Sequence, residues 1–158
     1  MSKSNFLKLI SYLFFVFQCT SCGTLGGLDS RVFLVSKEKI ENAIDSFYAI
    51  SSDYVIPAKW EQYDDWSKRG YDFLESRIFY FKSYPEEMYY VSFEGTSTSP
   101  ADTYTCAIAI RAVFKEDEKG WYLEDDLDKE DKKRIESRFD NEIVSKIEVY
   151  ANAKSERE

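Results

Sequence analysis

The first residues that could do chemistry are two tryptophans with acids beside them. Trp60 and Trp66 lie in one short segment, and Asp64 and Asp65 stand between them. Aromatic rings beside carboxylates are often found on surfaces that bind sugars. The same spacing fits a short helix or ordered loop that packs its rings onto the edge of a sheet. We expect the packed arrangement and keep all four residues as candidate ligand-binding residues.

Arg111 is the fifth candidate, because it lies among alanines and a valine in an apolar run expected to form a strand over 104–114. A guanidinium in such a place could bind an anionic ligand through two parallel hydrogen bonds. It could equally reach solvent or pair with an acid on a neighbouring strand. Both interpretations stay open from the sequence alone.

The residues needed for several common catalytic and metal sites are missing. The chain contains no histidine, which removes Ser/His and Cys/His nucleophile pairs and imidazole metal ligands. Gly95-x-Ser97-x-Ser99 lacks the second glycine of a nucleophile elbow. In the acidic run that starts at Asp126, neither the glycine nor the final glutamate of a calcium-binding EF-hand loop is in place. We therefore assign no catalytic residue, metal or cofactor.

Cys19 and Cys22 have the C-x-x-C spacing of dithiol oxidoreductases and zinc knuckles, but their position favours another role. They follow Lys3, Lys8 and an apolar run over 9–17, which together have the layout of a secretory signal. The apolar stretch is well short of the roughly 20 residues that a transmembrane helix needs. A permanent span is therefore not expected.

The residues around Cys22 are small, namely Thr20, Ser21 and Gly23. This pattern resembles the lipobox of bacterial lipoproteins, although Cys19 stands where leucine is usual. The resemblance implies cleavage after residue 21 and acylation of Cys22, and each buried methylene of the acyl chains would contribute about 0.8 kcal/mol. It also implies a membrane-anchored lipoprotein of the bacterial cell envelope that faces the periplasm or the cell exterior.

Beyond the signal peptide we expect a flexible tether over 22–29, one domain over 30–151 and a frayed tail over 152–158. The formal net charge of −8 becomes −10 once Lys3 and Lys8 are removed. Such a surface repels phosphates, so nucleic acid is excluded as a partner. Cys106 then remains as a single thiol, which we expect on the buried face of a strand.

Hydrophobic periodicity predicts an α+β domain: an antiparallel sheet of about four to five strands, with an N-terminal and a long C-terminal helix packed on it. Strands are expected over 31–35, 77–82, 88–94, 104–114 and 121–124, and helices over 37–50 and about 129–150. Strict alternation along 104–114 places Cys106, Ile108, Ile110, Ala112 and Phe114 on one face. The apolar stripe of the last helix is Ile135, Phe139, Ile143, Val144 and Ile147.

The stretch from Gly120 to Asp126 and the order of helix before sheet resemble small cystatin-like or NTF2-like domains, from which the long last helix departs. We expect a lipid-anchored binding or scaffolding protein with a protein partner in the envelope and no catalytic activity. One alternative is an NTF2-like pocket or enzyme site on the sheet face, lined by Tyr80, Tyr90 and Arg111. Another is an immunity or inhibitor protein that neutralises a basic toxin by charge complementarity.

Overall fold

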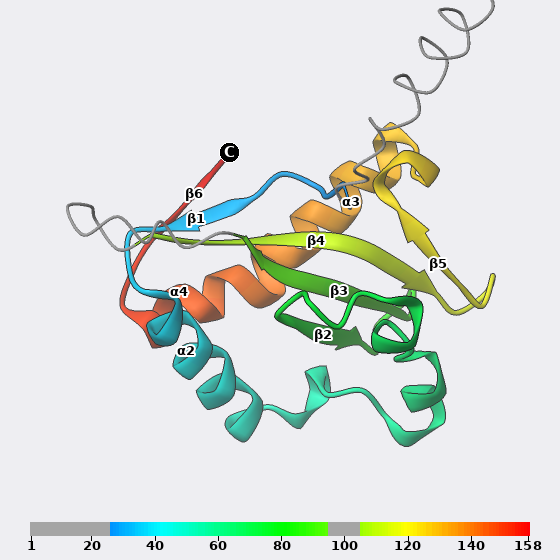
Figure 1. Ribbon diagram of the computed structural model, residues 1–158, viewed down its shortest axis with the longest axis horizontal. Coiled ribbons are helices and arrows are strands. Elements are labelled where there is room, and N and C mark those ends of the chain that lie inside the picture. The colour runs from blue at the N-terminus through cyan, green and yellow to red at the C-terminus, as the bar shows by residue number, and fades with distance from the viewer. Residues whose placement is uncertain (1–25, 95–104) are drawn as a thin grey trace, which may run out of the picture.

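A single antiparallel sheet organises the part of the chain that the computed structural model describes, residues 26–94 and 105–158 (Figure 1). The signal segment, Cys22 and Gly95-x-Ser97-x-Ser99 lie outside these residues. The strands are β1 (Arg31–Phe33), β2 (Ser76–Phe81), β3 (Glu87–Glu94), β4 (Cys106–Lys115), β5 (Gly120–Leu123) and β6 (Ser155–Arg157). Their order is β2-β3-β4-β1-β6, and β5 also pairs with β4.

The helices begin and end close to where the sequence predicts. They are α2 (Lys37–Ile50), α3 (Lys129–Phe139), a π-helical turn η5 (Asp140–Val144) and α4 (Ser145–Ala151), with short 3-10 turns η1 (Ser52–Tyr54), η2 (Ala58–Tyr63), η3 (Ser67–Arg69) and η4 (Glu124–Asp126). Asp128 caps α3 by accepting hydrogen bonds from the amides of Glu130 and Asp131, at 2.9 and 2.8 Å. The α+β fold class and the long C-terminal helix are confirmed.

The main core lies between one face of the sheet and the long helices, with α3 and α4 running behind the strands in Figure 1. The predicted stripe of the last helix is fully confirmed, because its residues are all buried in this core. Phe33, Phe47, Phe79 and Tyr89 fill the space between helices and sheet. Burial of each such side chain contributes about 1.5–3 kcal/mol. Cys106 is buried on this face as a free thiol, and burial raises its pKa to about 11.

The opposite face of the sheet is covered by residues 57–75, which form a second apolar layer. Trp60 packs there with Tyr80, Met88 and Phe114, and Trp66 packs with Tyr90. A strand that is apolar on both faces suits a sheet covered on both sides. The layer therefore explains why neither β2 nor β3 shows a polar face.

A β-bulge at Arg111 changes the side of the sheet that the residues after it face. The prediction of strict alternation along β4 is therefore corrected. Tyr90 pairs with Ala112 and Val91 pairs with Ile110, so the register shifts at Arg111, which is the extra residue of β4. The extra residue reverses the alternation. Cys106, Ile108 and Ile110 face the helices as predicted, whereas Ala112 and Phe114 face the second layer.

The prediction of a frayed tail is wrong. Asn152 adopts a left-handed conformation that ends α4, and the chain then returns along β1, where Val32 pairs with Glu156. The amide of Glu158 donates to the carbonyl of Ser30 at 3.0 Å. Arg157 binds Asp29 at 2.8 Å and also pairs with Glu136. The tail is held by backbone pairing and ion pairs, and it has no apolar face from which this could be predicted.

The last residues of the predicted tether are also packed, which corrects its boundary. Leu28 is buried, and its amide donates to the carbonyl of Ile110 at 3.0 Å. Gly27 lies so close to the bulge that an added Cβ would meet Arg111 Nη1 at 2.9 Å. The folded domain therefore begins at or before Gly27.

Candidate functional site

The two tryptophans do not form an exposed platform. Trp60 is 3 % and Trp66 is 4 % exposed. The ring of Trp66 stacks on Tyr90 with centroids 4.4 Å apart, and Trp60 meets Phe114 edge-on at 5.1 Å. The expected packing onto the sheet is confirmed, although it covers a face of the sheet and not its edge. A sugar-binding surface that uses the faces of these two rings is excluded because both rings are covered.

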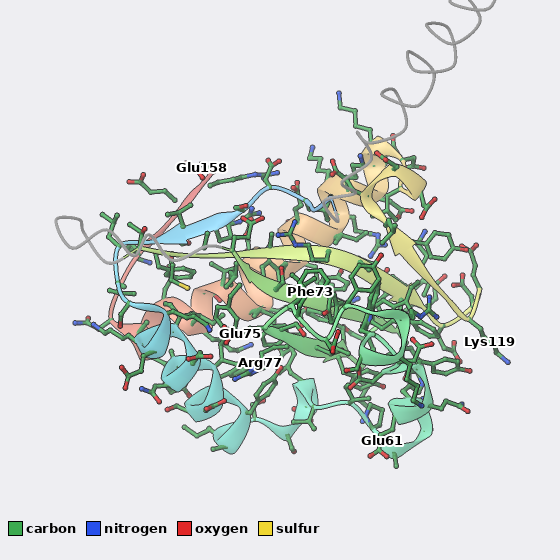
Figure 2. The ribbon with its side chains drawn as sticks, in the orientation of Figure 1. Glu61, Phe73, Glu75, Arg77, Lys119 and Glu158 are labelled. Carbon is green, nitrogen blue, oxygen red and sulfur yellow. The ribbon has the colours of Figure 1, made fainter. Side chains whose placement is uncertain are left out.

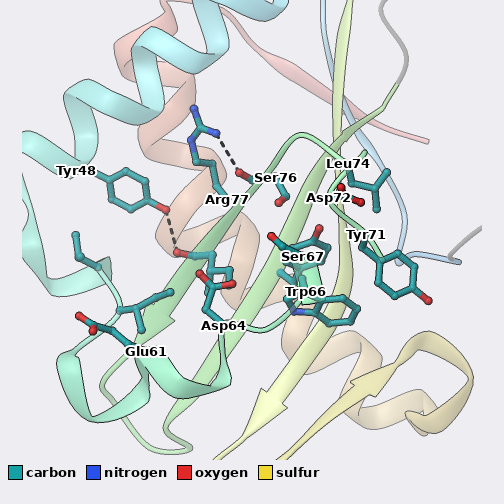
Figure 3. A pocket seen from close by; sticks show the side chains of 14 residues that line it. Tyr48, Glu61, Asp64, Trp66, Ser67, Tyr71, Asp72, Leu74, Ser76 and Arg77 are labelled. Carbon is teal, nitrogen blue, oxygen red and sulfur yellow. Dashed lines mark hydrogen bonds between the residues drawn. The ribbon is translucent and has the colours of Figure 1, made fainter. Parts of the chain in front are cut away.

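Trp66 nevertheless lines a cleft of about 580 Å³ that opens beside the second layer (Figure 3). Tyr48 of α2 and Val55 after it form one wall. Asp64, Trp66 and Ser67 come from the loop around η2 and η3, and Tyr71, Asp72 and Leu74 from the turn that precedes β2. Arg77 of β2 and Tyr90 of β3 complete it. The volume lies within the range of small ligand sites.

Short 3-10 turns position the loop side of the cleft. Pro57 precedes η2, and Trp60 donates its amide to the Pro57 carbonyl at 2.8 Å, which starts the turn. Gly70 ends η3 with φ of +89°, a conformation that favours glycine. The Tyr71 amide then donates to the Trp66 carbonyl at 3.1 Å. The chain therefore folds back on itself between Trp66 and Tyr71, and both side chains lie along the cleft.

Tyr48 and Arg77 line the side of the cleft next to α2. The Tyr48 hydroxyl donates to the carbonyl of Ile78 at 3.1 Å, and burial raises the pKa of Tyr48, which keeps the hydroxyl protonated. Arg77 Nη1 donates to the Ser76 carbonyl at 3.0 Å. Figure 3 shows the guanidinium of Arg77 at the opposite end of the cleft from Asp64.

The two adjacent aspartates have different surroundings. Asp65 pairs with Arg69 at 2.8 Å on the outer side of the loop. Asp64 lines the cleft, and among the described residues no side chain donates a hydrogen bond to its carboxylate. Burial raises the pKa of Asp64, and the neighbouring charge of Asp65 raises it further. Asp64 is therefore a partly desolvated carboxylate that a cationic group would stabilise.

The indole nitrogen of Trp66 is a second polar atom without a partner. Among the described residues, Trp66 Nε1 is the buried side-chain nitrogen or oxygen that makes no hydrogen bond. By contrast, Trp121 donates its Nε1–H to the Tyr63 carbonyl at 2.9 Å. An unsatisfied buried donor costs about 1–3 kcal/mol. The nitrogen has almost no accessible surface, so this cost belongs to the packing of the ring against Tyr90 and Trp121.

The cleft is acidic overall. Glu61 and Asp72 line it together with Asp64, and Arg77 is its basic residue. Figure 2 places Glu61 on the far side of the molecule from Glu158, so the cleft is remote from the C-terminal tail. The arrangement can attract a group that carries positive charge.

Arg111 lies outside this cleft. Its Nε donates to Ser92 Oγ and its Nη2 to Glu94 Oε1, both at 2.7 Å. Glu94 also accepts a hydrogen bond from Ser30. Of the two interpretations of Arg111, pairing with an acid on a neighbouring strand is therefore the one observed. The cleft includes Tyr90 but neither Tyr80 nor Arg111, so these three residues do not share the pocket expected of an NTF2-like site.

A buried ionic cluster that the sequence does not indicate lies at the start of β3. Glu87 is 1 % exposed, and Arg134 binds it through two nitrogens at 2.9 and 2.7 Å. Arg138 and the Tyr89 hydroxyl also donate to it, at 3.1 and 3.0 Å. Arg138 in addition holds the preceding turn through the carbonyls of Ser83 and Pro85. Because every partner is satisfied, we assign this cluster to structure.

The sequence-predicted site residues are thus only partly brought together. Trp66 and Asp64 share the cleft, whereas Trp60, Asp65 and Arg111 have structural partners elsewhere. Tyr48, Tyr71, Asp72 and Arg77 were missed. No local pattern marks them, because they come from segments that meet only in the folded chain.

Within 26–94 and 105–158 no cluster of three or more histidine, cysteine or acidic side chains is placed to hold a metal ion. None of the helices formed by these residues has the length and apolar character needed to span a bilayer. Comparison with protein-family models, curated proteins and solved structures found no match for the chain, and its resemblance to cystatin-like and NTF2-like domains stays a prediction.

Proposed function

We propose that the protein is a lipid-anchored binding module of a bacterial cell envelope that holds a partner non-covalently in the cleft between α2 and residues 57–75. The anchor is Cys22, and the support for it is the sequence pattern of Lys3, Lys8, the apolar run and the small residues around Cys22. The acyl chains would keep the domain at the bilayer surface, and the partner would be another component of the envelope.

The observation that carries the binding role is the acidic cleft of about 580 Å³. Glu61, Asp64 and Asp72 line it and are exposed, and no described side chain donates a hydrogen bond to the Asp64 carboxylate. Val55 on the cleft wall is 46 % exposed. A partner that brings a cationic and an apolar group to the cleft accounts for this combination.

The binding role is tested by site-specific photo-crosslinking in living cells of the source bacterium. A photoreactive phenylalanine analogue replaces Val55, which lies on the cleft wall, and in a matched control replaces Val149, an exposed valine of α4. We expect a crosslinked species that depends on light and on the Val55 position. Equal crosslinking from both positions, or none from Val55, would show that the cleft is not the binding site.

The anchor is tested separately by metabolic labelling with a fatty acid. Cys22→Ala is expected to abolish incorporation, whereas Cys19→Ala is expected to keep it. The reverse pattern would move the acceptor to Cys19, and incorporation in both variants would remove the lipid anchor from the proposal.

A further inference from the structure

We propose that the anchored domain stands with the end at which the chain enters it, next to η4, against the bilayer surface and turns the cleft away from the bilayer into the aqueous phase. This inference rests on the anchor at Cys22 in the proposed function and adds the orientation of the domain. The partner then reaches the cleft from the aqueous side, which excludes the lipid headgroups of the anchoring bilayer as that partner.

Few residues separate the acylated cysteine from the folded domain. Leu28 is buried with its amide bound to the Ile110 carbonyl, and Gly27 packs against the bulge of β4. Only residues 23–26 lie between Cys22 and Gly27 in the sequence. A fully extended chain spans at most about 3.6 Å per residue, so Gly27 lies within about 18 Å of the anchored cysteine. The end of the domain that carries Gly27 is therefore held at the bilayer surface.

The entry of the chain and the cleft lie at opposite edges of the sheet. Leu28 lies beside β4 on the edge that also pairs with β1 and β5. The cleft lies towards the other edge, where residues of β2 and β3 line it, and the Tyr48 hydroxyl of α2 donates to the Ile78 carbonyl of the last strand, β2. Figures 1 and 2 show Glu61, which lines the cleft, on the opposite side of the molecule from η4, the turn that follows β5.

The distance across the sheet exceeds the reach of the link between anchor and domain. From Leu28 the path to β2 crosses β4 and β3, which makes three strand spacings of about 4.8 Å each. Beyond β2 lies α2, and a helix is about 10 Å in diameter. If the α2 side of the cleft rested on the bilayer, Gly27 would stand about 24 Å above the headgroups, whereas the link spans about 18 Å.

The surface of the domain by itself favours the reverse orientation. On the cleft side Val55 is 46 % and Phe73 is 73 % exposed, and apolar side chains favour contact with a bilayer interface. The end next to Gly26 carries the acids of η4, because a Cβ on Gly26 would lie 3.5 Å from Glu124 Oε2. Anionic headgroups repel such an end. The length of the link and the chemistry of the surface therefore predict opposite orientations.

The test is resonance energy transfer from the domain to the bilayer. The full chain is purified from membranes with its acyl groups and reconstituted into phosphatidylcholine vesicles that carry an acceptor dye on their headgroups. The donor dye is coupled to Asp125→Cys in one variant and to Glu61→Cys in the other. Both positions are exposed and each change removes one negative charge, so the two variants are matched. Cys106 stays unlabelled because it is buried.

We expect the rate of transfer from position 125 to be at least about threefold the rate from position 61, because the link of about 18 Å holds the first position near the headgroups. Equal or reversed rates in a vesicle-bound chain would overturn the orientation and leave the anchor and the binding role of the cleft standing. A chain that stays off the vesicles would reject the anchor and this inference together.

A longer link tests whether its length sets the orientation. Insertion of about 20 glycine and serine residues between Gly23 and Thr24 gives the link a root-mean-square length of roughly 27 Å, which is enough for the cleft side to reach the bilayer. We expect the difference in transfer between positions 125 and 61 to fall by at least about half. An undiminished difference would show that the link does not set the orientation and would overturn the inference.

Discussion

Ile110 and Ala112 lie two residues apart on β4, yet their side chains face opposite sides of the sheet. The bulge at Arg111 between them lets one strand serve both apolar layers. It also places the Ile110 carbonyl where the amide of Leu28 can bind it. The same bulge therefore determines two contacts: the packing of Leu28 at the start of the domain, and the packing of Ala112 in the second apolar layer beside the cleft.

Two adjacent glycines test the packing of the chain against this bulge. A Cβ on Gly27 would lie 2.9 Å from Arg111 Nη1 and 3.1 Å from the Ile110 carbonyl, whereas a Cβ on Gly26 meets its nearest atom at 3.5 Å. We expect Gly27→Ala to lower the free energy of unfolding by about 1–3 kcal/mol, as overpacking does, and Gly26→Ala to change it by less than about 0.5 kcal/mol. Urea denaturation measures both. Equal stability of the two variants would mean that the segment is not packed on the bulge.

The buried cluster of Glu87, Arg134 and Arg138 gives a second prediction. Glu87→Gln keeps the shape but leaves two guanidiniums without their buried carboxylate, and we expect a loss of about 3 kcal/mol in unfolding free energy. Glu86→Gln is the matched control. Glu86 is more exposed and binds Lys59, so its loss should stay below about 1 kcal/mol. A smaller effect at Glu87 than at Glu86 would contradict the structural role assigned to the cluster.

The C-terminal tail should stabilise the edge of the sheet. Truncation after Lys154 removes β6, its pairing with β1 and the ion pairs of Arg157. We expect a loss of about 1–3 kcal/mol and faster hydrogen exchange at the amides of Arg31–Phe33. Exchange at β1 that is unchanged by the truncation would restore the frayed tail that the sequence suggests.

Folding should shift the pKa values of Asp64 and Asp131 in opposite directions from the same ordinary value. Burial and Asp65 raise the pKa of Asp64, whereas the hydrogen bond from Lys115 leads the interactions that lower the pKa of Asp131. At pH values between its unfolded and its raised folded pKa, the Asp64 carboxyl binds more protons in the folded state than in the unfolded state. Its contribution to stability is present at lower pH and is lost as pH rises through that window. The contribution of Asp131 is present above its unfolded pKa and is lost as pH falls.

Carboxyl-carbon NMR titration measures both groups, and Asp64→Asn should abolish the higher of the two transitions. A folded Asp64 that titrates at or below Asp131 would contradict the desolvation of the cleft.

The sequence predicts the parts of this fold that depend on local periodicity. The stripe from Ile135 to Ile147 follows the 3.6-residue period, and the hairpin of β2 and β3 follows alternation and a proline turn. The bulge could not be predicted, because Arg111 is neither glycine nor asparagine and the extra residue is evident only against the partner strand. β6 could not be predicted either, because the residues it contributes are polar and its stability comes from pairing with β1.

The candidate site was predictable only in part for the same reason. The cluster of aromatic and acidic residues around Trp66 and Asp64 drew attention to the correct loop. The opposite wall, with Tyr48 and Arg77, comes from α2 and β2, and only the tertiary structure brings it there. Spacing along the chain also could not distinguish Asp64 from Asp65, whose roles differ because one faces the cleft and the other faces Arg69.

The central claim is that the cleft between α2 and residues 57–75 holds a partner in the envelope, and the most direct measurement is photo-crosslinking in cells from Val55 on the cleft wall. The account predicts a light-dependent crosslinked species from Val55 and none from Val149, an exposed valine of α4. Equal yields from the two positions would contradict the account.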